Sequence, residues 1–172
     1  RHTSSGARGM IGAGFGLTPE HPEYARLKDR FLDLYAQFIC IETSLFPGMT
    51  ELLDRLDAAS IPWGVVTNKA ERFTHPLLAA LDVARRSQCI VCGDTTPKTK
   101  PHPEPLLHAA RLLDVAPATC IYVGDDVRDI QAATAASMRS VAAGYGYLGD
   151  GAPPEQWGAD QLIQHPLELW DH

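Results

Sequence analysis

Three carboxylates follow a short apolar run in the last third of the chain. Asp125 and Asp126 come directly after Gly124, and Asp129 follows three residues later. The apolar run predicts a buried strand, and open α/β sheets bind their ligands at the carboxyl ends of strands. Carboxylates this close repel one another unless a cation is near, so the spacing favours a divalent metal. The competing interpretation is structural: Asp126 caps the following helix, and the other two carboxylates are solvated.

Two other segments end in groups that suit phosphate binding. An apolar run ends in Thr67, Asn68 and Lys69, whose hydroxyl, amide and amine groups are donors for phosphate oxygens. Lys100 lies in a proline-rich loop, where a rigid backbone could aim its charge into a crevice. Each segment also has a simpler explanation: Thr67 or Asn68 caps a helix, and Lys100 is a solvated residue in a stiff linker.

Alternating strands and helices would position these groups. The hydrophobic pattern predicts strands at 62–67, 88–92, 119–123, 139–143 and 161–163, with helices at 49–59, 71–81, 103–113 and 127–136. This alternation indicates βαβ units and an α/β fold with a parallel sheet. Because parallel strands end at the same edge, we expect Thr67, Lys100 and Asp125 to converge on one phosphate site with a divalent cation.

The opening segment differs from the rest of the chain. Residues 1–45 predict a pair of helices without a strand: a weak, glycine-rich helix at 5–16 and a long amphipathic helix ending near residue 42. Phe46, Pro47 and Gly48 then break the pattern. We therefore expect a helical unit at 1–45 and an α/β core at 46–172.

The composition of the chain argues against several classes of protein. The chain has 172 residues and a net charge of −6, which argues against nucleic-acid binding through a basic surface. No apolar run approaches membrane-spanning length. Cys89 and Cys92 lie in a predicted buried strand, where side chains three residues apart point to opposite faces, so we expect small buried hydrophobes rather than metal ligands. These features predict a reduced, cytoplasmic protein whose oligomeric state stays open.

Taken together, the three functional segments resemble motifs II, III and IV of haloacid dehalogenase-type phosphatases. They span residues 65–69, 100–106 and 123–130, and the likeness is nearest to phosphoglycolate and N-acetylmuramic acid 6-phosphate phosphatases. Segments 145–147, 157–160 and 165–169 also resemble the tail of that group. The resemblance implies a Rossmann-like parallel sheet core, with residues 1–45 forming part of a small helical cap that closes over the substrate.

The resemblance also implies roles by position. Thr67 and Asn68 would bind the phosphoryl oxygens. Lys100 would neutralise the phosphate and steady a phosphoenzyme. Asp125 would be a ligand of Mg²⁺, while Asp126 and Asp129 would bind or orient the metal shell, Asp129 from outside the direct ligands.

The cap would contribute to substrate recognition. The segment around Arg8 resembles the part of the cap that faces the site, so Arg8 could bind a carboxylate or a sugar of a small phosphorylated metabolite. The alternative is a surface arginine on a frayed first helix.

One motif of the family is missing from these 172 residues. Motif I, an Asp-x-Asp-x-Thr loop, supplies the nucleophilic aspartate and further Mg²⁺ ligands. In family members its strand lies at the centre of the sheet, between the strands equivalent to 62–67 and 119–123. We therefore expect an upstream strand in the natural protein, no turnover by the 172-residue chain, and unpaired backbone groups where that strand would lie.

The expected function of the complete protein is Mg²⁺-dependent hydrolysis of a small phosphomonoester through a phosphoaspartyl intermediate. Two alternatives stay open. One is a non-catalytic module that binds phosphate or metal. The other is a related phosphotransferase, or a dehalogenase that acts on a carbon–halogen bond.

Overall fold

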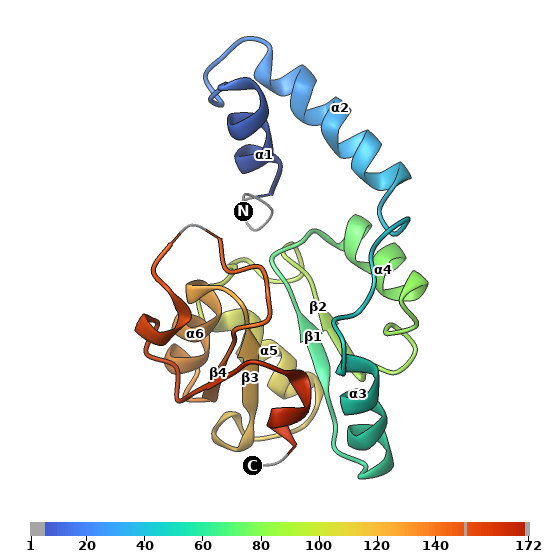
Figure 1. Cartoon of the computed structure of the whole chain (residues 1–172), viewed down its shortest axis with the longest axis vertical. Coiled ribbons are helices and arrows are strands. Elements are labelled where there is room, and N and C mark those ends of the chain that lie inside the picture. Colours follow the sequence, from blue (N-terminus) through green and yellow to red (C-terminus); the bar gives the residue numbers. More distant parts are fainter. Residues whose placement is uncertain (1–5, 150, 171–172) are drawn as a thin grey trace.

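The chain folds into a pair of N-terminal helices, which form the predicted cap, and an α/β core. The computed structural model describes residues 6–149 and 151–170, so residues 1–5 of the predicted cap lie outside the described part. Helices α1 (Gly6–Phe15) and α2 (Tyr24–Gln37) pack against each other. They stand together at one end of the molecule, above the core (Figure 1).

Helix α2 ends earlier than predicted, at Gln37 rather than near residue 42. Ile39, Ile41 and Thr43 follow the helix, and β-branched residues have lower helix propensity than unbranched ones. The Thr43 hydroxyl donates to the Ile39 carbonyl oxygen at 3.3 Å, which stabilises a turn at this place.

The core contains five short strands and four helices among the described residues. In chain order they are α3 (Met49–Ala58), β1 (Gly64–Val66), α4 (Glu71–Ala80), β2 (Cys89–Val91), α5 (Glu104–Leu112), β3 (Ile121–Gly124), α6 (Val127–Ala135), β4 (Arg139–Ala143) and β5 (Gln161–Ile163). All strand pairs are parallel, which confirms the predicted α/β fold. None of the described helices is long and apolar enough to cross a membrane.

The strands form two separate sheets. β1 pairs with β2, and β3, β4 and β5 form the second sheet in that order. Within the described residues no ladder joins β1 to β3, which is the place where the family resemblance puts a further strand. In the described residues, the backbone edges of β1 and β3 that face each other are therefore left without strand partners, as the family resemblance implies.

Side chains connect the two edges instead. The Thr67 N–H donates across to Val91 on β2, so the carbonyl of the preceding residue, Val66, points the other way, toward β3. Its oxygen accepts from the Tyr122 hydroxyl and from Lys100 Nζ, each at 3.1 Å. An orphaned strand carbonyl is thus satisfied by polar side chains, as buried backbone groups require.

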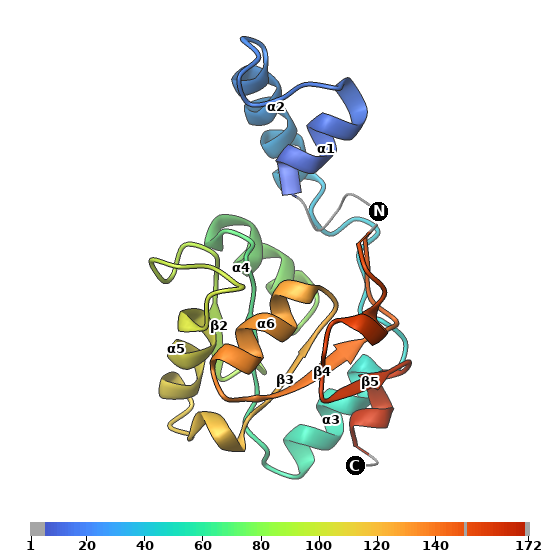
Figure 2. The same ribbon diagram turned by 90° about the vertical axis from the view of Figure 1, so that its left-hand side faces the viewer.

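Helix packing also links the two sheets. Helix α5 contacts both β1 and β2, and α6 contacts β3 and β4 (Figure 2). Leu106 of α5, only 1% exposed, clusters with Ala132, Ala133 and Met138 of the α6–β4 unit, while Val66 packs against the same cluster. The apolar core therefore runs continuously beneath the split in the sheet.

The cysteines behave as the sequence analysis predicts. All four are free, and Cys89 and Cys92 are buried. Burial raises the pKa of both thiols, so they stay protonated near neutral pH. Within the described residues, no group of three or more His, Cys, Asp or Glu side chains is arranged to hold a metal ion.

Candidate active site

Lys100 occupies the centre of the candidate site. Its ammonium group contacts three oxygens: Asp129 Oδ1 at 2.6 Å, the Tyr122 hydroxyl at 2.8 Å and the Val66 carbonyl at 3.1 Å. An ammonium has three N–H donors, so each has an acceptor here. The side chains of Lys100 and Asp129 are only 10% and 8% exposed. The alternative interpretation of Lys100 as a solvated residue in a stiff linker is therefore wrong, and its ammonium group is held between the two sheets.

Asn68 holds the loop that carries Lys100. Its Nδ2 donates to the Lys100 carbonyl at 2.9 Å, and its Oδ1 accepts from the Lys100 N–H at 3.0 Å. The carboxamide thus pairs with both backbone groups of one residue and fixes the distance between the loop and the end of β1. A direct contact between Asn68 and substrate stays a prediction.

The hydroxyl of Thr67 lies in the turn that follows β1. Its Oγ1 accepts from the Lys69 N–H at 3.1 Å. This contact uses a lone pair and not the hydroxyl proton, which is the group that would donate to a phosphoryl oxygen. Thr67 is half-buried at the same edge of the core as Lys100, as the sequence analysis expects.

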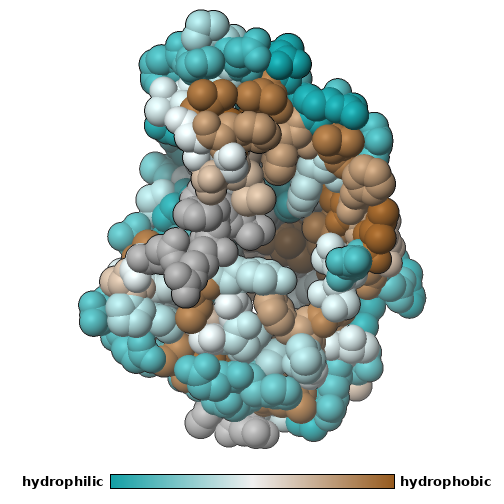
Figure 3. All heavy atoms as spheres, turned by 45° about the horizontal axis from the view of Figure 1, so that its top comes forward, coloured by the Kyte–Doolittle hydropathy of each residue, from teal (hydrophilic) through white to brown (hydrophobic). Residues whose placement is uncertain are grey.

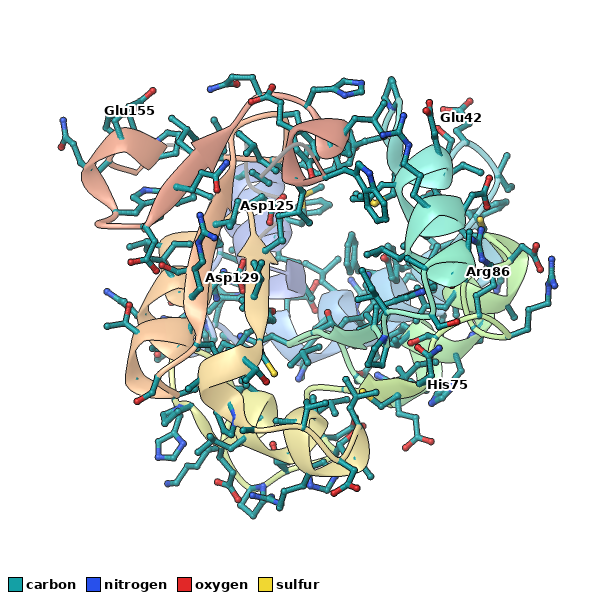
Figure 4. The ribbon with its side chains drawn as sticks, turned by 90° about the horizontal axis from the view of Figure 1, so that it is seen from below. Glu42, His75, Arg86, Asp125, Asp129 and Glu155 are labelled. Atoms are coloured by element: carbon teal, nitrogen blue, oxygen red, sulfur yellow. The ribbon has the colours of Figure 1, made fainter. Side chains whose placement is uncertain are left out.

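Asp125 lies directly after β3 and is held by the segment that follows β4. Its Oδ2 accepts from the Tyr147 N–H at 2.8 Å. Burial raises the pKa of Asp125, and the nearby Asp129 and Asp126 add to this effect, while the Tyr147 N–H opposes it. In Figure 4 the labelled side chains of Asp125 and Asp129 lie together beside β3, on the inner side of the core.

Close packing at Asp125 requires a glycine at position 146. A Cβ added to Gly146 would come within 2.2 Å of the Cβ of Asp125, closer than two non-bonded carbons can approach. The carboxylate is therefore positioned from the β4 side both by a hydrogen bond and by the shape of the backbone.

This packing gives a testable prediction for Gly146→Ala. We expect a loss of about 1–3 kcal/mol in the free energy of unfolding, because overpacking forces neighbouring atoms to move. Urea denaturation measures the change. Gly151→Ala is the matched control, since a Cβ there meets no atom within 4 Å. Equal stability of the two variants would contradict the packing argument.

Asp126 is engaged by its own helix. It is the N-cap of α6, and it forms a capping box with Asp129. Its carboxylate also accepts two bonds from the Arg128 guanidinium, from Nε at 2.8 Å and from Nη2 at 2.7 Å. These bonds to Arg128 lower the pKa of Asp126. The structure supports the capping interpretation of the sequence, and a metal-binding role of Asp126 stays a prediction.

The carboxylates fit a Mg²⁺ ion only in part. Asp129 is paired with Lys100 and Asp126 with Arg128, so each is already neutralised by a protein cation. Asp125 is the acid whose pKa is raised by burial, and a nearby divalent cation would relieve that cost. Mg²⁺ is often bound by one or two carboxylates together with substrate phosphate oxygens. Asp125 therefore fits as the protein ligand of such an ion.

Tyr122 belongs to the site although the sequence analysis did not select it. Burial raises its pKa well above the ordinary value, and the charge of Asp129 adds to this effect. The phenol therefore keeps its proton and can donate to Val66 while it accepts from Lys100. A tyrosine within an otherwise apolar strand, three residues before the first acid, was the available signal.

Arg8 is not brought into this cluster. It is exposed on α1, and the electrostatic partner described for it is Glu20, in the loop between α1 and α2. Its predicted role in substrate recognition stays a prediction.

Known proteins are similar to this chain both in sequence and in fold. A model of the haloacid dehalogenase-like hydrolase family matches residues 17–143. An N-acetylmuramic acid 6-phosphate phosphatase from Pseudomonas putida is 41% identical over 166 residues, 96% of this chain and 74% of the relative. A phosphoglycolate phosphatase from Xanthomonas campestris pv. campestris is 43% identical over 169 residues, 98% of this chain and 76% of the relative.

A solved structure agrees with the sequence matches. The crystal structure of a predicted phosphoglycolate phosphatase from Haemophilus somnus superposes with a TM-score of 0.85 at 26% identity, covering 98% of this chain and 74% of that protein. The family model covers most of the chain, including β1, the Lys100 loop and the acids after β3. The chain therefore belongs to the haloacid dehalogenase-like hydrolases, in agreement with the resemblance found in its sequence.

Proposed function

We propose that this protein is part of a Mg²⁺-dependent phosphatase that hydrolyses a small phosphomonoester bearing a carboxylate or a sugar. The observation that carries the proposal is the buried Lys100 ammonium between the end of β1 and the start of α6. Lys100 would bind a phosphoryl oxygen in place of one of its present acceptors, such as the Val66 carbonyl, and phosphoryl transfer requires both positioning and charge stabilisation of the phosphate. The relatives named phosphoglycolate and N-acetylmuramic acid 6-phosphate phosphatases support the same class of substrate.

Each residue of the site has a defined part in this proposal. Thr67 donates its hydroxyl proton to a phosphoryl oxygen, and Asn68 keeps the Lys100 loop in place. Lys100 supplies positive charge, while Tyr122 and Asp129 hold its ammonium group. Bound Mg²⁺ would add charge neutralisation beside Asp125.

The proposed reaction also needs a nucleophilic carboxylate. Asp126 and Asp129 are paired with cations, and Asp125 is proposed as the metal ligand. The family resemblance puts the nucleophile on a further strand between β1 and β3, so our proposal places it outside the 172 residues.

The experiment is an activity assay of the purified 172-residue chain with p-nitrophenyl phosphate and 2-phosphoglycolate, with and without Mg²⁺. We expect phosphate to bind but no turnover, because the attacking carboxylate is absent. Binding is followed by NMR titration with inorganic phosphate. Mg²⁺-dependent turnover by this chain would place the nucleophile among its own residues, and no binding of phosphate would defeat the proposed function.

We also place the protein in the cytoplasm. Its four cysteines are free, as expected in a reducing compartment.

A further inference from the structure

The side chain of Lys69 has a fixed starting point at the edge of the site. Its N–H donates to Thr67 Oγ1 at 3.1 Å. Its carbonyl accepts from the Gly93 N–H at 2.9 Å and from the Thr74 hydroxyl at 3.1 Å. Three hydrogen bonds therefore hold the backbone of Lys69, two residues after the threonine that is proposed to bind phosphate.

The ammonium group of Lys69 reaches the cap. It donates to the hydroxyl of Tyr35 on α2. The Tyr35 ring packs edge-on against Phe73 of α4, with centroids 5.4 Å apart, and stacks against Phe31 of its own helix. Tyr35 is thus held by aromatic contacts on both sides, and it presents its hydroxyl group at the junction of cap and core. Figure 3 shows a hollow between these two parts of the molecule.

Lys69 differs from the other basic residues of the site because they are paired with acidic side chains. Lys100 pairs with Asp129, and Arg128 pairs with Asp126. Among the ion pairs of the described residues, Lys69 has no acidic partner. Its ammonium group donates to the Tyr35 hydroxyl and lies 4.5 Å from the centroid of the Tyr35 ring. Lys69 and Tyr35 are both half-buried. A half-buried ammonium without an anion is electrostatically incomplete, and an anionic ligand group would complete it.

We infer that Lys69 and Tyr35 form a subsite for the carboxylate of the substrate, which is a specificity-determining role in the proposed phosphatase. The inference rests on the proposed function, because it assumes that the phosphate lies at Thr67 and Lys100. Lys69 keeps two N–H donors beyond the one used by Tyr35, and Tyr35 accepts that bond and keeps its own hydroxyl proton. These donors match the two oxygens of a carboxylate.

The position of the subsite also limits the size of the ligand. Thr67 and Lys69 belong to a single turn after β1, so the reach of these two side chains sets the separation between a phosphate at the first and a carboxylate at the second. Because Lys69 comes from the core and Tyr35 from the cap, only a cap placed as it is here completes the subsite. This assignment differs from the expectation for Arg8, which is exposed on α1.

The test compares two phosphate monoesters that differ in the group at the end opposite the phosphate. 2-Phosphoglycolate carries a carboxylate, and ethyl phosphate carries a methyl group. Dissociation constants are measured by NMR titration of the full 172-residue chain in the presence of Mg²⁺. We expect Lys69→Met to raise the dissociation constant of 2-phosphoglycolate about tenfold, which is the usual effect of losing a hydrogen bond to a charged group. The dissociation constant of ethyl phosphate should stay unchanged.

Further variants separate recognition from packing. Tyr35→Phe keeps the aromatic contacts and should weaken the binding of 2-phosphoglycolate but not that of ethyl phosphate. Lys69→Arg keeps the positive charge and should still bind 2-phosphoglycolate more tightly than ethyl phosphate. Lys98→Met is the matched control, because this exposed lysine lies in the neighbouring loop. The amide spectrum of each variant verifies its fold.

The possible failures are distinguishable. If Lys69→Met weakens the binding of both esters equally, or of neither, the assignment of the carboxylate subsite is wrong and the proposed function stands. If the unmodified chain binds neither ester, the proposed function fails and the subsite fails with it.

Discussion

Replacing Lys100 by methionine is expected to lower the free energy of unfolding by about 3–5 kcal/mol, the usual cost of removing one partner of a buried ion pair. The side chain of Asp129 is 8% exposed, so its charge would stay in the interior without the ammonium that is 2.6 Å away. The same change should abolish the binding of inorganic phosphate. Urea denaturation and NMR titration measure the two effects.

A second substitution tests the cause of this instability. In the Lys100→Met, Asp129→Asn double variant no charge is left unpaired, and the new carboxamide would keep an oxygen for the capping bond from the Asp126 N–H. We expect the double variant to recover most of the lost stability but none of the phosphate binding. Lys98→Met, at an exposed position two residues earlier, should change neither quantity. A stable single variant that binds phosphate would contradict the role of the buried pair.

Truncation of Leu106 to alanine is expected to cost about 2–5 kcal/mol, as is typical of large-to-small substitutions in a packed core. Leu106 is 1% exposed and belongs to the helix that packs on β1 and β2. It also contacts the cluster formed by α6 and β4. Its loss should therefore weaken the apolar link between the sheet that carries Thr67 and the sheet that carries Asp125, as well as overall stability.

Leu112→Ala is the matched control for this prediction. Leu112 lies on the same helix but is 54% exposed, so its truncation removes little buried area. Thermal unfolding followed by circular dichroism measures both variants. A similar shift in the two midpoints would show that the core under the split sheet does not depend on Leu106.

The positions of the functional groups at the ends of strands could be predicted from the sequence more accurately than the contacts of their side chains. The hydrophobic pattern and the breaks after it located the ends of β1 and β3, because these features depend on local periodicity. It also correctly favoured buried thiols at Cys89 and Cys92. The family resemblance added the expectation of a gap between β1 and β3, and the structure has two sheets at that place.

Pairing of side chains across the fold could not be predicted in the same way. Asn68 reads as a phosphate ligand, but its carboxamide binds the backbone of Lys100, 32 residues away. The contact of Tyr122 with Val66 spans 56 residues. Such contacts depend on how strands lie next to one another, and residue type and local spacing do not encode that information. The end of α2 was misplaced for a different reason, since weak helix formers continued its hydrophobic rhythm.

Because the sheet is divided, a ligand bound at the proposed site would connect the two halves of the core. Thr67 and the Lys100 loop belong to one half of the core, and Asp125 belongs to the other. In the described residues, no strand ladder joins these halves. A phosphate held by Thr67 and, through a cation, by Asp125 would act as a cross-link between them. Any ligand that binds only the folded chain raises its stability by mass action, so here saturation with substrate should also stiffen the junction between the halves.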